Sequence, residues 1–386
     1  MSKFGLWWVM WDKSTGTHKS RMTYKGQLPV SFYEAVQWFK DRDFDVAVFL
    51  GNIRYSGRKL TEYTINSLKE YIKTYTCAEG KYQTGYSDGQ NFSQWVSSKV
   101  NRTLEYYIVI PESYMLERTI TGVVNGGRVE YNSIPRDCPA NGFYNSYWHG
   151  WIDGVLSVPD SSRLGFYWGY ESCLQATVHD PNLKYIFNPF CNYNNTEYIE
   201  KYTSFLKDMS NYIHNHGLEL IWIPTIGNRT MKYVTNPNYV AVPILARYFN
   251  QVFVQPHYYQ TTKLSDGSDY SFQELVRRVK WMYENGLSIE MEADNSIIGE
   301  PSNCAYCKST QNRKGCDLTL TPETEEKCIN RACDYVNAIL EAYSELFHRP
   351  PLSPGTVINE LFPHRAYYFG TDFEVVTRVR SKCPNW

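Results

Sequence analysis

The feature that most constrains the fold is a regular alternation of short apolar runs with longer segments of helical periodicity. The apolar runs are rich in β-branched and aromatic residues, whereas the longer segments repeat apolar residues every three or four positions. A strand followed by a helix, repeated about eight times, is the pattern of a (β/α)8 barrel. The expected strands span residues 4–11, 45–51, 105–111, 164–171, 218–224, 251–259, 288–294 and 365–370.

We expect a single barrel domain over residues 1–386, with a long connection before the fourth strand that acts as a lid. A doubly wound open sheet is the main alternative, but no glycine-rich nucleotide fingerprint follows the first strand. The eighth strand is short, and residues 356–361 compete with it. The expected helices cover residues 30–43, 61–75, 92–104, 197–216, 238–250, 272–283 and 324–347.

Composition narrows the classes of ligand and the compartment. The net charge of -1 provides no basic field for nucleic acid, whereas 33 Tyr and 11 Trp suit stacking on sugars. No apolar run is long enough for a membrane span, and the first eleven residues resemble a strand rather than a signal peptide. Ten cysteines and four glycosylation sequons favour a secreted or cell-surface protein, although an intracellular protein of a hyperthermophile is an open alternative.

The seventh expected strand carries an unusual acidic face. Glu290, Glu292 and Asp294 alternate with apolar residues, so the three carboxyl groups share one side of the strand. Side-by-side carboxylates repel one another, and burial raises their pKa values. An exposed edge strand would solvate them, but a barrel mouth would place them where carboxyl groups carry out chemistry.

Functional residues of such barrels lie at the C-terminal ends of the strands. Glu171 ends the fourth strand, and the seventh strand faces it across the mouth. Two carboxyl groups in this arrangement are what glycoside hydrolysis requires, with a separation of about 5–5.5 Å for retention and about 6.5–9.5 Å for inversion. We expect Glu171 to be the general acid/base and Glu292 the nucleophile, because Glu292 lies nearer the strand end than Glu290.

Other polar and aromatic residues at the strand ends are candidates for substrate binding. Arg54 is a candidate partner of Glu290, and His257 and Tyr259 are candidate hydrogen-bond donors to the nucleophile or to a sugar hydroxyl. Among the tryptophans, those of the long connection are better candidates for a cleft than those on strands, about half of which should pack against helices. The expected binding residues are Trp11, Asp12, Arg54, Trp148, Trp151, Gln255, His257, Tyr259, Asp294 and Tyr368.

Half of the cysteines fall within an expected insertion at residues 300–333, after the seventh strand: Cys304, Cys307, Cys316, Cys328 and Cys333. Disulfides, a structural zinc site and free thiols all remain open, and the spacings beyond Cys304-x-x-Cys307 match no common zinc module. Cys173 and Cys191 flank the loop after Glu171 and are a further candidate pair. No catalytic metal motif is present, so we expect no metal and no cofactor.

Four blocks, at residues 165–171, 220–224, 254–259 and 289–294, resemble the signature blocks of a microbial family catalogued as domain of unknown function 4855. The resemblance covers most of the chain in the right order and implies a (β/α)8 barrel related to glycoside hydrolases. The placement of Glu171 and of the seventh-strand glutamates is also similar to that in retaining glycosidases of clan A. In that clan a fourth-strand Glu is the acid/base and a seventh-strand Glu is the nucleophile. Tyr170 stands where that clan typically has Asn.

The sequence therefore predicts a glycoside hydrolase that acts on a polysaccharide or glycan chain. One alternative is a non-catalytic carbohydrate-binding protein on the same barrel. Another is a hydrolase or lyase in which the acidic trio and His257 hold a divalent ion.

Overall fold

A computed structural model describes residues 2–12, 14–52, 81–111, 120–124, 127–131, 142–169, 171, 196–236, 242–307, 320–349 and 352–386. Within this part of the chain, no helix is both long enough and apolar enough to cross a membrane.

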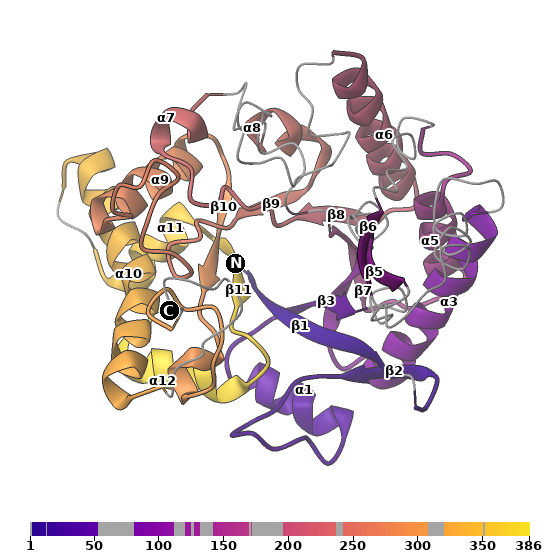
Figure 1. Ribbon diagram of the computed structural model, residues 1–386, viewed down its shortest axis with the longest axis horizontal. Helices are drawn as coiled ribbons and strands as arrows, with labels where there is room; N and C mark the ends of the chain where they lie inside the picture. Colours follow the sequence, from indigo (N-terminus) through magenta and orange to yellow (C-terminus); the bar gives the residue numbers. More distant parts are fainter. Residues whose placement is uncertain are drawn as a thin grey trace.

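Eight parallel strands form a closed barrel surrounded by helices (Figure 1). The barrel closes where Ser2–Gly5 of the first strand pair with His364–Tyr367 of the last. This closure confirms the predicted TIM-barrel fold and excludes the open sheet. In spatial order the strands are β1 (Ser2–Asp12), β3 (Val46–Asn52), β4 (Glu105–Ile110), β7 (Arg163–Trp168), β8 (Glu219–Trp222), β9 (Gln251–Val254), β10 (Ser288–Glu292) and β11 (His364–Tyr368).

Two further β elements lie outside the parallel barrel. Strand β2 (Thr17–Ser20) pairs antiparallel with the end of β1. Strands β5 (Ile120–Val124) and β6 (Gly127–Tyr131) form a separate antiparallel hairpin in the connection between β4 and β7.

The helices of the outer ring are α1 (Phe32–Lys40), α3 (Lys81–Val100), α5 (Tyr147–Leu156), α6 (Thr196–Asn215), α9 (Phe272–Glu284), α10 (Pro322–Phe347), α11 (Pro354–Leu361) and α12 (Phe373–Lys382). Shorter helical segments are α7 (Met231–Val234), α8 (Val242–Leu245), η3 (Ala246–Tyr248) and η4 (Asn295–Ile298). Local chemistry explains several helix starts. Ser271 accepts a hydrogen bond from the Glu274 N–H at the start of α9, and Thr321 caps α10 just before Pro322.

Some predicted boundaries need correction. Helix α3 begins at Lys81, well before the predicted residue 92, because two glycines and several polar residues obscure its apolar stripe. Residues 356–361 belong to helix α11 and do not compete as the eighth strand. The expected helix over 61–75 lies outside the described residues.

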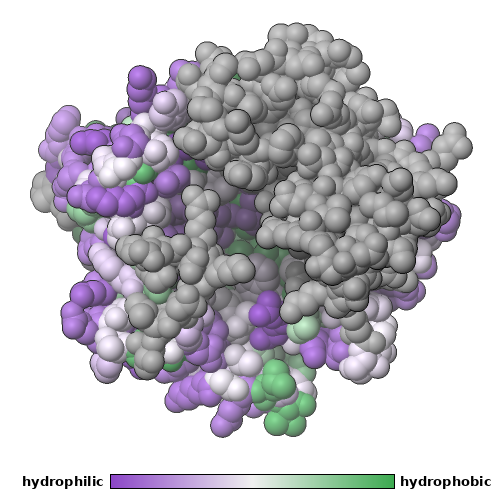
Figure 2. Space-filling model, viewed as in Figure 1, coloured by the Kyte–Doolittle hydropathy of each residue, from purple (hydrophilic) through white to green (hydrophobic). Residues whose placement is uncertain are grey.

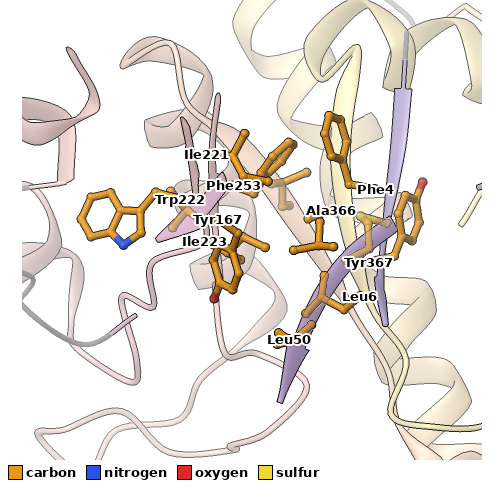
Figure 3. Close-up of a cluster of buried hydrophobic side chains, with 14 of the residues drawn as sticks. Phe4, Leu6, Leu50, Tyr167, Ile221, Trp222, Ile223, Phe253, Ala366 and Tyr367 are labelled. Atoms are coloured by element: carbon orange, nitrogen blue, oxygen red, sulfur yellow. The ribbon is translucent and has the colours of Figure 1, made fainter. Parts of the chain in front are cut away.

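The barrel interior is packed with side chains from opposite strands (Figure 3). The ring of Phe4 on β1 lies 4.8 Å from that of Phe253 on β9, and 5.8 Å from that of Tyr107 on β4. Trp222 points away from this cluster and stacks on Phe249 with centroids 5.0 Å apart. As expected for alternating side chains, some strand tryptophans therefore face the outer helices.

Helices α3 and α5 approach each other through four glycines. An added Cβ at Gly85 would lie 2.0 Å from the Tyr147 carbonyl oxygen, and one at Gly89 would lie 2.2 Å from that of Trp151. Gly150 and Gly154 make the reciprocal approach to the α3 backbone, at 1.9 and 2.0 Å. The long connection before the fourth strand thus contains a helix docked tightly on the barrel wall.

Disulfides anchor α10 at two points. Cys304 is bonded to Cys328, and Cys333 to Cys383 just after α12. Cys307 is also disulfide-bonded. The disulfide alternative is therefore confirmed for these cysteines, and the zinc alternative, which needs free thiolates at Cys304 and Cys328, is wrong. Cys173, Cys191 and Cys316 lie outside the described residues.

Candidate active site

The acidic strand β10 is buried at the mouth of the barrel. Glu290 is 2 % exposed, and Glu292 and Asp294 are fully buried. The Glu290 carboxyl interacts electrostatically with those of both Glu292 and Glu171, so carboxyl groups from β10 and from the end of β7 lie close together. The predicted meeting of these two strand ends therefore exists in the structure.

Strand register explains this meeting. Ser288 and Ile289 of β10 pair with Phe253 and Val254 of β9, so Glu290 and Gln255 follow at the same level. Gln255 in turn bridges to Thr225, whose N–H donates to the Glu171 carbonyl oxygen at 3.0 Å. The ends of four neighbouring strands are thus aligned in register. The aligned residues are Glu171, Thr225, Gln255 and Glu290.

Glu171 is half-buried, and two neighbouring side chains hydrogen-bond to its carboxyl group. The Tyr167 hydroxyl donates to Oε1, and the Gln255 side chain makes the second contact. Burial raises the pKa of Glu171, whereas both hydrogen bonds act in the opposite direction. Gln255, predicted as a substrate-binding residue, also donates to the Ile223 carbonyl at 2.9 Å and so has a fixed orientation.

Both carboxyl oxygens of Glu292 accept hydrogen bonds. The His257 N–H donates to Oε1 at 3.0 Å, and the Tyr335 hydroxyl donates to Oε2. Burial raises the pKa of Glu292 to about 7, although these donors, the Tyr259 N–H and the nearby Arg278 guanidinium favour the charged form. His257, a predicted hydrogen-bond donor to the nucleophile, makes this contact through its backbone.

Glu290 differs from its neighbour because its Oε1 is buried and accepts no hydrogen bond from the described residues. Burial, followed by the adjacent charges of Glu292 and Glu171, raises the pKa of Glu290 well above its usual range. A buried carboxyl without a donor is costly in its charged form, so these surroundings favour the neutral acid.

Asp294 and Tyr259 form a buried pair beside the glutamates. The Tyr259 hydroxyl donates to Asp294 Oδ1 at 2.9 Å, and the Ser296 N–H donates to the same oxygen at 3.0 Å. Asp294 also accepts from the Asn303 N–H, so it caps the segment after β10. These contacts leave Asp294 in a supporting position rather than at the reacting centre.

Tyr368 and Trp8 supply an aromatic wall. Tyr368 pairs with Glu292 in the sheet register, and its pKa is raised by burial and then by Asp294, with Glu290 and Glu292 adding to the effect. Trp8 lies edge-on to the Tyr368 ring with centroids 6.3 Å apart. Trp8 is partly exposed, and its Nε1 has no hydrogen-bond partner among the described residues. The face viewed in Figure 2 is hollowed near its centre.

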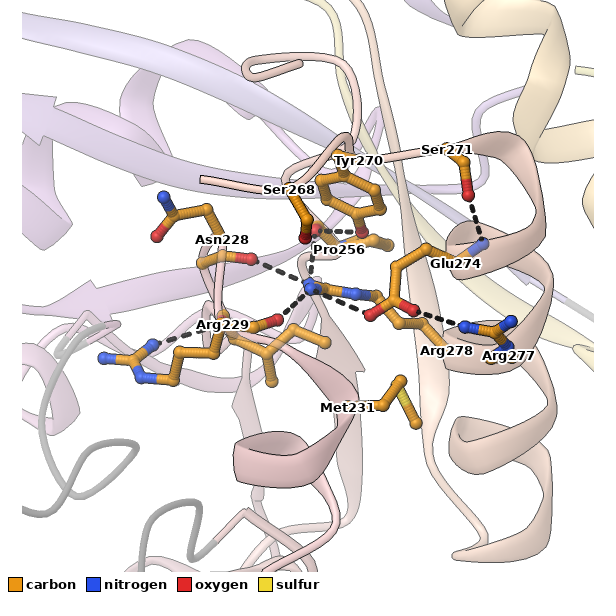
Figure 4. Close-up of polar contacts among 12 residues, drawn as sticks. Asn228, Arg229, Met231, Pro256, Ser268, Tyr270, Ser271, Glu274, Arg277 and Arg278 are labelled. Carbon is orange, nitrogen blue, oxygen red and sulfur yellow. Dashed lines mark hydrogen bonds and ion pairs between the residues drawn. The ribbon is translucent and has the colours of Figure 1, made fainter. Parts of the chain in front are cut away.

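A buried arginine holds the loops that follow β8 and β9 (Figure 4). Arg278 of α9 donates to the Gly227 carbonyl at 2.8 Å, the Pro256 carbonyl at 3.1 Å, and the Arg229 carbonyl. Glu274 lies 3.7 Å from its guanidinium, and the Tyr270 ring centroid lies 4.3 Å from it. The loop that presents His257 and Tyr259 to β10 is therefore fixed from outside the barrel.

A second arginine, Arg331 of α10, secures the same loop further along. Its guanidinium donates to the carbonyls of Tyr258 and Thr261, and lies 3.6 Å from the centroid of the Tyr258 ring. Arg278, Arg331 and Tyr335 were all missed by the sequence analysis. They lie on helices, and inspection of strand ends gives no signal for them.

Two predicted binding residues are corrected by the structure. Trp148 and Trp151 lie on α5 and are almost fully buried. Their indole N–H groups donate at 3.0 Å to the carbonyls of Pro111 and Val109, respectively. They attach α5 to the barrel wall rather than lining a cleft, because the connection that carries them forms an amphipathic helix with its aromatic face inward.

The remaining predicted residues lie near the end of β1 or outside the described residues. Trp11 is half-buried and contacts the His18 ring edge-on at 4.8 Å. Asp12 accepts hydrogen bonds from the Ser14 hydroxyl and N–H, which with Lys19 lower its pKa to about 2. Asp12 therefore organises the turn into β2. Arg54, the predicted partner of Glu290, is not among the described residues.

Across the described part of the chain, no three His, Cys, Asp or Glu side chains are grouped in a way that could hold a metal ion. The acidic trio and His257 all belong to that part. The carboxyl oxygens of Glu292 and Asp294 accept hydrogen bonds from described residues.

No protein-family model matches the chain. It is 28 % identical over 347 residues to an uncharacterized protein of Methanocaldococcus jannaschii, covering 79 % of this chain and 80 % of that protein. The resemblance to the family of unknown function therefore stays a prediction.

Two solved structures are similar to the chain at low TM-scores. A group IV chitinase of Ostrinia furnacalis has a TM-score of 0.44 and 11 % identity, covering 98 % of this chain and 99 % of that chain. A β-glucosidase from Exiguobacterium marinum has a TM-score of 0.35 and 10 % identity, covering 88 % and 77 %. At these scores neither structure says what this chain acts on.

Proposed function

We propose that this chain is a glycoside hydrolase that cleaves a polysaccharide or glycan chain with two carboxyl groups and retains the anomeric configuration. The observation that carries the proposal is the convergence of Glu171 from the end of β7 with Glu290 and Glu292 of β10. Carboxyl groups at the mouth of a barrel, one protonated and one charged, are what glycosidic bond cleavage requires. The reaction needs no cofactor.

In the first step Glu171 donates its proton to the glycosidic oxygen as the bond from that oxygen to the anomeric carbon breaks. A β10 carboxylate forms a bond to the same carbon and gives a glycosyl ester. In the second step the Glu171 carboxylate takes a proton from water, and the water oxygen attacks the anomeric carbon. The ester bond breaks, the β10 carboxylate is released, and Glu171 is again protonated.

The surroundings of Glu171 suit this exchange of roles. It is more exposed than the β10 glutamates and can reach a leaving group, while burial raises its pKa and favours the acid form. Tyr167 and Gln255 hydrogen-bond to the carboxyl, so they stabilise the carboxylate when it forms. The partly exposed ring of Trp8, beside Tyr368, offers an apolar surface that suits a sugar ring.

The test is reducing-end release from a panel of polysaccharides, with and without a chelator. The proposal predicts cleavage of at least one polysaccharide at a rate that the chelator leaves unchanged. Loss of cleavage with the chelator would favour the metal-dependent alternative. Binding of a polysaccharide without any cleavage would instead favour the carbohydrate-binding protein.

A further inference from the structure

We infer that Glu290 is the β10 carboxyl that reacts with substrate, and that Glu292 is a positioning residue that holds the loop after β9 against β10. This assignment rests on the proposed function and reverses the preference for Glu292 that its place near the strand end suggested. It follows from what each carboxyl group already contacts.

Both carboxyl oxygens of Glu292 already accept hydrogen bonds. It is completely buried, its Oε1 accepts from the His257 N–H at 3.0 Å, and its Oε2 accepts from the Tyr335 hydroxyl. Attack on an anomeric carbon by either oxygen would draw electron density from its hydrogen bond and weaken the contact with a buried donor.

The donor Tyr335 is itself held in place. Its hydroxyl also accepts from the Tyr259 N–H at 3.1 Å. Tyr335 lies one helical turn beyond Arg331, which binds the carbonyls of Tyr258 and Thr261. Two disulfides fix α10 near these residues. One joins Cys328, which precedes Arg331, and the other joins Cys333, which lies between Arg331 and Tyr335. Glu292 is therefore one partner in a rigid joint between α10, the loop after β9 and β10.

The hydrogen bonding of Glu290 differs from that of Glu292. Glu290 Oε1 accepts no hydrogen bond from the described residues, and its level in the sheet is that of Gln255, which contacts Glu171. It is near enough to interact with the charges of both Glu171 and Glu292. The Glu290 carboxyl, between those of Glu171 and Glu292, can contact a substrate through Oε1 without giving up a hydrogen bond to a described residue, whereas Glu292 cannot.

The chemistry requires one proton on the pair formed by Glu171 and Glu290. Burial without a donor favours the proton on Glu290; burial also favours it on Glu171, where Tyr167 and Gln255 stabilise the carboxylate that forms when the proton leaves. The reactive form has the proton on Glu171, from which it passes to the leaving oxygen. The charge left on Glu290 forms the bond to the anomeric carbon, so atoms and charges balance without another reactant.

Azide rescue separates the two glutamates. The variants Glu290→Ala and Glu292→Ala are assayed with and without sodium azide on a polysaccharide that the wild type cleaves. At a vacated nucleophile, azide reaches the anomeric carbon and forms a carbon–nitrogen bond as Glu171 protonates the leaving sugar. We expect azide to raise turnover of Glu290→Ala at least tenfold and to leave Glu292→Ala unchanged. Rescue of Glu292→Ala alone, or of neither variant, would overturn the assignment.

Thermal unfolding gives a second readout that needs no substrate. Glu292→Gln and Tyr335→Phe should lower the melting temperature because each breaks the joint, whereas Glu290→Gln should leave it unchanged or raise it. Equal losses in Glu290→Gln and Glu292→Gln would contradict the positioning role, even if no polysaccharide were cleaved. Absence of cleavage with the expected stability pattern would instead count against the proposed function alone.

Discussion

The backbone N–H of His257 donates to Glu292 Oε1 at 3.0 Å, and this bond joins the loop after β9 to the acidic strand β10. His257 adopts the left-handed backbone conformation, with φ of 59°, at the point where its N–H makes this bond. A backbone hydrogen bond from the loop thus fixes the place of a buried carboxyl group at the barrel mouth.

The acid cluster should make the protein less stable as pH rises. Burial raises the pKa of Glu292 from 4.5 to about 7, so the folded chain keeps a proton that the unfolded chain loses between these values. Stability should therefore fall across this range, by roughly 3 kcal/mol from Glu292 alone. Melting temperatures at pH 5 and pH 8 test this, and Glu292→Gln should show a smaller difference between them. A wild-type protein that melts at a higher temperature at pH 8 would contradict the account.

Replacing Arg278 by Lys should destabilise the protein by about 3–5 kcal/mol. The change leaves the carbonyls of Gly227, Pro256 and Arg229 without a guanidinium donor, and a lysine cannot reproduce the planar fork. Urea unfolding measures the loss. The adjacent Arg277, whose side chain is 65 % exposed, provides the matched control, and Arg277→Lys should change stability by less than about 0.5 kcal/mol. Similar losses for the two variants would remove Arg278 from its supporting role.

The barrel and its strand order were predictable because both depend on periodic patterns. All eight predicted barrel strands are present, and the acidic alternation of residues 288–294 does place Glu290 and Glu292 at the mouth. The supporting contacts were not predictable. Tyr335 and Arg278 reach the site from helices, at distances along the chain that no local pattern connects to β10. Trp148 and Trp151 were misplaced because a helix inside a long connection has no strand end by which to locate it.

Trp151→Ala should cost about 3–5 kcal/mol of stability, because it removes a fully buried ring and the indole donor to the Val109 carbonyl. Trp11→Ala, at a half-buried position, is the comparison and should cost less. Thermal unfolding of the two variants decides between a structural tryptophan and a sugar platform. If Trp151→Ala retained wild-type stability, the corrected role of this residue would be wrong.

Gly154→Ala should also destabilise the protein, by about 1–3 kcal/mol or more, because its Cβ would lie 2.0 Å from the Tyr86 carbonyl oxygen in α3. Gly355→Ala is the control, since the nearest atom to its Cβ is the flexible Asn385 side chain at 3.2 Å. Both variants can be compared by urea unfolding. Equal stability of the two would show that α3 and α5 tolerate a wider separation than their backbones have here.

The central claim is that Glu171 transfers a proton during glycosidic bond cleavage. The most direct measurement is the rate of reducing-end release by Glu171→Gln on a polysaccharide that the wild type cleaves, beside the exposed control Glu284→Gln. Loss of a positioned acid/base group predicts a fall of about 10²–10⁴-fold for Glu171→Gln, with the control at the wild-type rate. A Glu171→Gln rate within threefold of wild type would contradict the account.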